Sequence, residues 1–218
     1  MRHSLLVLFM FLALPGPDGS VWQEPDIGMP ARIRTTGEGF WFVDHGTSPP
    51  VGEGTLRTYR IEVERETGID VRAFTALAER ILSNERGWTG TGRWALQRVS
   101  APDADIRVVV ATPDTVDRLC AQAGLDTHGE VSCWNGRFAA LNADRWVKGA
   151  MGFVGSLRAY REYLLNHEVG HGLGYRHQAC PRPGARAPVM QQQTYATKPC
   201  KANGWPTLSN EAVGPVTP

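Results

Sequence analysis

The chain of 218 residues carries the stretch His167-Glu168-Val169-Gly170-His171-Gly172-Leu173-Gly174-Tyr175-Arg176-His177, which reads H-E-x-x-H-x-x-G-x-x-H. In a helix the first two histidines leave the same face, one turn apart. The glutamate is offset from the first histidine by about 100° and lies beside that pair. Three imidazoles with an adjacent carboxylate fit a catalytic zinc ion (Zn2+), which needs three protein ligands, one open position and a general base. The stretch therefore predicts a zinc site near the end of a helix.

The residues before this stretch predict the helix that carries it. The segment 155–166 contains no proline, and Ser156 is suited to the N-cap position. Apolar residues continue at helical spacing, so one face of the helix is expected to pack against a sheet. These residues are Leu165, Val169 and Leu173.

Gly174 has a backbone role in the pattern. A continued helix would carry His177 about 100° per residue further around the axis, away from the other two histidines. Glycine adopts the left-handed conformation that ends a helix at little cost. The sequence therefore predicts that the helix ends at Gly174 and that the chain turns His177 back towards the metal.

The stretch resembles the signature of the metzincin metallopeptidases, which is followed by a methionine-containing turn, the Met-turn. The chain is similar in particular to a domain family of unknown function that is found in secreted bacterial proteins and regarded as metzincin-like. The resemblance is carried by 166–177, by Ala187-Pro188-Val189-Met190-Gln191-Gln192 and by the flanking cysteines. It extends over about 37–206.

This resemblance implies a role for each matching residue. His167, His171 and His177 would bind the metal, Glu168 would be the general base, and Met190 would be the methionine of the Met-turn. The implied fold is α/β (α+β), a metzincin-like zincin domain whose twisted mixed sheet carries a backing helix and an active-site helix. The strand before the active-site helix would be an edge strand that can pair with an extended peptide. The alternative is a plain hairpin strand sealed by a bond between Cys120 and Cys133, and both can hold. Only a short, proline-interrupted segment follows the Met-turn, so the lower half of the cleft is expected to be small.

The four cysteines indicate an oxidising compartment. Four cysteines permit three pairings, and the sequence does not choose among them. The natural pairing is Cys120 with Cys133 and Cys180 with Cys200, in which the second bond brackets Met190. Zinc ligation by cysteines is the alternative, which the lack of C-x₂₋₄-C pairs disfavours.

The N-terminus indicates export. Residues 1–19 combine a charged start with a short apolar run and predict a signal peptide, followed by a linker over 20–36. The catalytic domain is expected at 37–206 and a C-terminal tail at 207–218. An uncleaved membrane anchor is the alternative, although the apolar run is shorter than the ~20 residues of a span. No stable membrane insertion is expected, and a net charge of +1 with mixed signs argues against a nucleic-acid partner.

Alternating and helical patterns predict the other elements of the domain. Strands are expected at 39–43, 56–63, 94–99, 106–110 and 138–142, and helices at 71–82 and 113–120. Asp70 is the expected N-cap of the first of these helices, and Thr112-Pro113 opens the second. A short helix is possible at 208–213.

Several conspicuous side chains are not expected to take part in the site. His45 and His128 fall in turn-like segments and are interpreted as surface residues. Tyr195 is near the Met-turn, but its spacing does not match the tyrosine that some metzincins use, so a structural role is favoured. Asp144 and Trp146 follow the strand at 138–142, and their spacing does not require a place in the cleft.

The sequence therefore predicts a secreted, monomeric zinc metalloendopeptidase that acts on a peptide or protein in extended conformation. The alternative is a secreted zinc-containing binding or cell-envelope protein without protease turnover. Hydrolysis of a non-peptide amide is a third possibility, because the same zinc-and-water chemistry serves it.

Overall fold

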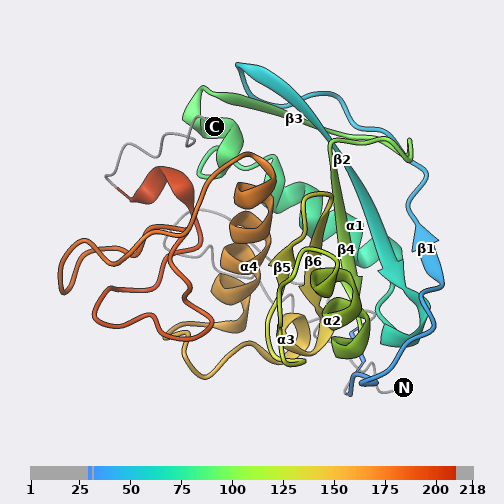
Figure 1. Cartoon of the computed structure of the whole chain (residues 1–218). Coiled ribbons are helices and arrows are strands. Elements are labelled where there is room, and N and C mark those ends of the chain that lie inside the picture. The colour runs from blue at the N-terminus through green and yellow to red at the C-terminus, as the bar shows by residue number, and fades with distance from the viewer. Residues whose placement is uncertain (1–28, 31, 210–218) are drawn as a thin grey trace, which may run out of the picture.

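A six-stranded mixed sheet organises the fold, which the computed structural model describes for residues 29–30 and 32–209 (Figure 1). The strands run in the order β1-β2-β4-β6-β5, and β3 also pairs with β2. Four α-helices accompany the sheet in the described part of the chain, so the architecture is mixed α+β. The strands are β1 (Trp41–Val43), β2 (Thr55–Glu64), β3 (Trp94–Arg98), β4 (Ile106–Ala111), β5 (Cys133–Trp134) and β6 (Phe138–Asn142), and the helices are α1 (Val71–Leu82), α2 (Pro113–Ala121), α3 (Ala143–Lys148) and α4 (Leu157–Gly172).

The edge of the sheet nearest α4 is formed by β5, not by β6. Strand β6 pairs in parallel with β4 on one side and in antiparallel with β5 on the other. The expectation that the strand at 138–142 is an edge strand was therefore wrong. The two residues of β5 are too few to show an alternating pattern, so the sequence did not reveal the strand that covers β6.

Successive residues of the central strands point to opposite faces, and helices cover both faces. Val108 and Val110 of β4 belong to the main core, which also contains residues of α1 and α4. Val109 and Ala111 face the other way, where they pack with Val116 of α2. Strand β4 is buried on both faces from Val108 to Ala111, which explains why its sequence is a continuous apolar run there.

Side-chain caps begin both long helices where the sequence places them. The Asp70 carboxylate accepts a hydrogen bond from the Ala73 amide at 2.8 Å, and the Ser156 hydroxyl accepts one from the Ala159 amide at 3.1 Å. Helix α3 was not predicted, because its single stretch of six residues is too short for a periodic pattern. It buries Trp146 completely against Phe74 of α1, with ring centroids 5.0 Å apart.

Two disulfides join Cys120 to Cys133 and Cys180 to Cys200. The natural pairing of neighbours in the sequence is thereby confirmed, and none of these four cysteines is free to bind a metal. The first bond connects α2 to β5, and the second closes the irregular segment that follows α4.

The residues near the two ends of the expected domain are described as follows. Ile33 lies within the segment expected to be a linker, yet its side chain is buried in the main core. At the other end a 3₁₀ turn at Pro206–Leu208 is described, while 210–213 of the expected short helix lie outside the described residues. The expected signal peptide also lies outside them. No helix among the described residues is both long and apolar enough to cross a membrane.

Candidate metal centre

Helix α4 presents His167 and His171 one turn apart, and backbone carbonyl groups fix the orientation of both rings. The His167 Nδ1 atom donates to the Val189 carbonyl oxygen at 2.8 Å, and the His171 Nδ1 atom donates to the Tyr175 carbonyl oxygen at 2.8 Å. Because a carbonyl oxygen can only accept, each Nδ1 carries the proton and each Nε2 has a free lone pair. This is the tautomer that a metal-binding histidine needs, with the outward nitrogen held by a supporting acceptor.

The third histidine reaches the same point after a glycine turn. Gly174 has φ of 93°, a conformation that favours glycine, and its amide donates to the His171 carbonyl oxygen at 3.0 Å. The His177 Nε2 atom then lies 3.1 Å from the Nε2 atom of His171. One nitrogen from each of His167, His171 and His177 falls within 4.8 Å of the others. Ligands at 2.0–2.1 Å from a tetrahedral zinc ion stand roughly 3.3 Å apart, so the donor set fits zinc in both type and spacing.

Burial keeps the two helical imidazoles neutral. Burial, with the neighbouring His171 as a smaller cause, lowers the pKa of His167 to about 3. Burial likewise lowers the pKa of His171 to about 4. Neutral imidazole is the form that binds a metal, so both rings are ready to act as ligands at neutral pH.

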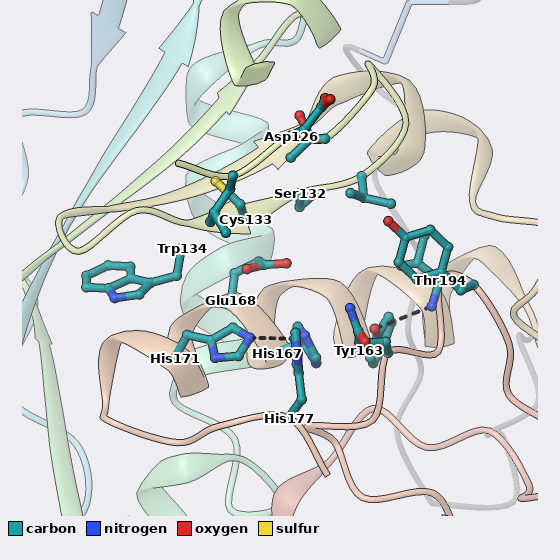
Figure 2. A pocket seen from close by; sticks show the side chains of 15 residues that line it. Asp126, Ser132, Cys133, Trp134, Tyr163, His167, Glu168, His171, His177 and Thr194 are labelled. Atoms are coloured by element: carbon teal, nitrogen blue, oxygen red, sulfur yellow. Dashed lines mark hydrogen bonds between the residues drawn. The ribbon is translucent and has the colours of Figure 1, made fainter. Parts of the chain in front are cut away.

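Glu168 is buried beside the histidines, and one of its carboxylate oxygens accepts no hydrogen bond from the protein. Its side chain is 4 % exposed, and its Oε2 atom is buried without a hydrogen-bond partner in the protein. Burial raises the pKa of this carboxyl to about 8. Figure 2 shows the carboxylate between the three histidines and the segment that carries Cys133 and Trp134. An unpartnered buried carboxylate oxygen is costly, so its presence beside a candidate metal centre points to a role there.

Met190 packs against α4 at Gly170, where the helix lacks a side chain. A Cβ atom at Gly170 would stand 2.6 Å from the Met190 sulfur and 2.6 Å from Trp88 Cζ2. Met190 is fully buried, and it follows Val189, whose carbonyl orients His167. The Met-turn role that the resemblance implies for Met190 stays a prediction.

Tyr175 anchors the chain immediately after the helix. Its ring stacks on Trp88 with centroids 4.5 Å apart, and its hydroxyl accepts a hydrogen bond from Trp94 Nε1 at 3.1 Å. The ring stacking and the hydroxyl hydrogen bond fix the Tyr175 side chain. Its backbone carbonyl is thereby held where it accepts the hydrogen bond from His171 Nδ1.

A cleft of about 310 Å³ opens over the histidines. One wall comes from 125–134, which includes β5, and the other from 192–195. Trp134 lies above His171 in this view, while Tyr163 and Thr194 lie on the other side of the histidines (Figure 2). The sequence carried no signal for these wall residues, because they come from short irregular segments that only the tertiary fold brings together.

The remaining sequence expectations fall outside the metal cluster. His45 and His128 are exposed, as expected. Trp146 is a core residue and does not line the cleft. Tyr195 lines the cleft and is 57 % exposed, and the structural role favoured for it stays a prediction.

The family model described as "Protein of unknown function (DUF3152)" matches residues 28–208. No curated protein and no solved structure matches the chain. The matched segment contains the whole of the sheet, the three histidines and both disulfides.

Proposed function

Because the chain belongs to the family described as a protein of unknown function, DUF3152, we propose its function from its own geometry: a zinc-dependent endopeptidase with a metzincin-like fold. One observation carries the proposal. Nitrogen atoms of three histidines converge beside a buried carboxylate with an unpartnered oxygen. In two of these histidines a backbone carbonyl accepts the Nδ1 proton, which leaves the Nε2 lone pair free. A purely structural zinc site fills its fourth position with protein and has no use for such a carboxylate.

His167, His171 and His177 would hold the metal in this proposal. When bound, zinc supplies Lewis-acid chemistry: it polarises a substrate carbonyl, makes a water molecule more acidic and, as a nearby positive charge, favours the ionised form of Glu168. Because the tautomer and orientation of His167 and His171 are already fixed, these two rings would need little rearrangement when the metal binds.

Glu168 carries the proton in the hydrolysis. As a water oxygen attacks the carbonyl carbon, the Glu168 carboxylate accepts the proton of that water at its free oxygen. When the carbon–nitrogen bond breaks, the same carboxyl returns the proton to the leaving amine. The burial of Glu168 keeps bulk water from competing for its free oxygen.

The lining of the cleft argues against a carboxypeptidase. Among the described residues, its lining includes two acidic side chains, Glu168 and Asp126, and no lysine or arginine. The described lining therefore offers no basic side chain to bind a substrate's terminal carboxylate. The two disulfides and the absence of a spanning helix among the described residues agree with the proposal that the protein is secreted.

The testing experiment compares Glu168→Gln with His171→Ala on a broad peptide library, with zinc content measured by metal analysis. Glu168→Gln is expected to retain zinc and lose hydrolysis, whereas His171→Ala is expected to lose both. A fully active Glu168→Gln protein would refute the mechanism. A wild-type protein that holds zinc and cuts no peptide would instead support a zinc-containing binding protein without turnover.

A further inference from the structure

Three exposed apolar residues, Met151, Val154 and Tyr195, lie on two neighbouring segments at the border of the cleft, and we call them the apolar shelf. The exposed fractions of these side chains are 103 %, 60 % and 57 %. Tyr195 lines the cleft, and the backbone at Gly152 lies against the Tyr195 carbonyl, so Met151 and Val154 belong to a segment that adjoins the cleft wall. Clustered exposed apolar side chains next to a site are typical of surfaces that bind another molecule.

Backbone contacts hold the two segments of the shelf together. The Thr197 amide donates to the Gly152 carbonyl oxygen at 2.9 Å, and the Val154 amide donates to the Thr197 hydroxyl at 3.2 Å. A Cβ atom at Gly152 would lie 2.2 Å from the Tyr195 carbonyl oxygen, so the chain needs glycine at this close approach. The shelf is therefore a built surface that joins two segments of the chain.

A buried aromatic residue, Phe153, connects the shelf to α4 through ring contacts. Phe153, between Met151 and Val154, is 7 % exposed, and its ring stacks on Tyr163 with centroids 5.5 Å apart. Tyr163 in turn lies 5.2 Å from the His167 ring, measured between centroids. This row of rings fixes the position of the shelf relative to the histidines, so a molecule bound on the shelf has a defined register at the metal.

We propose that the apolar shelf binds apolar side chains of an extended polypeptide substrate beyond the residues that occupy the cleft. The inference rests on the proposed endopeptidase function and names its substrate class: polypeptides with apolar residues several positions away from the bond that is cut. Continuity with the cleft at Tyr195 selects the substrate chain as the occupant. Binding energy gained there raises the specificity constant for long substrates, because remote contacts help to orient the scissile bond.

The test uses matched peptides that share one cleavable core, which the library digest identifies. Short peptides contain the core alone, and long peptides extend it on either side with leucines or, as the polar counterpart, with serines. The wild-type protein is expected to cut one leucine-extended peptide with a kcat/KM at least about tenfold above that of its serine-extended counterpart. Met151→Ser combined with Val154→Ser is expected to remove that preference while zinc content is retained.

A control variant and two contrary outcomes complete the design. Leu56→Ser changes a side chain on β2 that is 48 % exposed and lies outside the cleft lining, and it is expected to keep the preference. Equal cleavage of leucine and serine extensions by the wild-type protein would overturn the shelf proposal and leave the endopeptidase intact. Binding to anionic phospholipid vesicles that the shelf variant loses, without a peptide preference, would also overturn it by assigning the surface to lipid. If the wild-type protein cuts no peptide, the proposed function itself fails.

Discussion

The Nδ1 atom of His167 and the carbonyl oxygen of Val189 are 2.8 Å apart, and their hydrogen bond connects α4 to the segment that contains Met190. It is the long-range bond by which a residue far along the chain sets the tautomer of a candidate ligand. The bond between Cys180 and Cys200 encloses Val189, so the covalent framework and the ligand orientation are linked.

Replacement of Cys180 and Cys200 by serine is expected to weaken zinc binding as well as the fold. The disulfide limits the freedom of the segment around Val189, and a loop of this size contributes about 3 kcal/mol of stability. Zinc affinity should fall by roughly tenfold, as expected when a group that supports a ligand is loosened. Zinc titration with a competing chelator measures the affinity, and urea unfolding measures the stability.

The matched control for this disulfide replaces Cys120 and Cys133, which close a loop of comparable length. That variant should lose a similar amount of stability and keep its zinc affinity, because its bond encloses none of the carbonyl groups that orient the ligands. Equal zinc affinity in the two variants would contradict the link between the second disulfide and the site.

Gly170→Ala is expected to destabilise the protein although alanine is the better helix former. The added Cβ atom would meet the Met190 sulfur and the Trp88 ring, each at 2.6 Å. Overpacking of this kind costs about 1–3 kcal/mol, which exceeds the helix-propensity gain of about 1 kcal/mol. Urea unfolding measures the change, and a double-mutant cycle with Met190→Ala should show a coupling that lessens the cost. A stabilised Gly170→Ala protein would mean that Met190 does not occupy this position.

Metal-free Glu168→Gln protein is expected to become more stable than metal-free wild-type protein as the pH rises. Burial raises the pKa of the Glu168 carboxyl to about 8 from its ordinary value of 4.5, so the folded state binds this proton more tightly than the unfolded state. The contribution of the protonated carboxyl is therefore fully present below pH 4.5 and is lost as the pH rises towards 8. Glutamine does not titrate, so the stability difference should grow to roughly 2–5 kcal/mol across that window. Urea unfolding at pH 4 and pH 8 checks this, and a difference that does not change with pH would contradict it.

Removal of zinc is expected to lower the unfolding temperature, because a ligand that binds the folded state stabilises it by mass action. At a free zinc concentration of about 1,000 times the dissociation constant, the stabilisation is about 4 kcal/mol. Thermal unfolding with and without chelator measures the shift. His177→Ala should abolish the shift, and His128→Ala, which changes an exposed residue outside the cluster, should retain it.

Local signals in the sequence predicted the helix of the site, its cap at Ser156 and its end near Gly174, because these depend on residues within a few positions of one another. They did not predict β5, whose two residues are held in the sheet by pairing with β6. Nor did they predict that Trp134 and Tyr195 line one cleft, since that depends on long-range packing. The three candidate ligands could be recognised in the sequence because the histidines lie in one short run. The walls of the cleft could not, because they come from distant segments.

The closeness in sequence of His167, His171 and His177 has a consequence for the way the protein folds. An unfolded or newly exported chain brings these imidazoles together by closing only a short loop, which carries little entropic cost. In the proposed zinc protein the unfolded chain would therefore also bind some zinc, which would reduce the net stabilisation that the metal gives to the native state. The native state keeps its advantage through the carbonyls of Val189 and Tyr175, which orient the rings before the metal arrives. On this proposal zinc would be captured before the chain folds, and the geometry of the folded site would depend on contacts that form later.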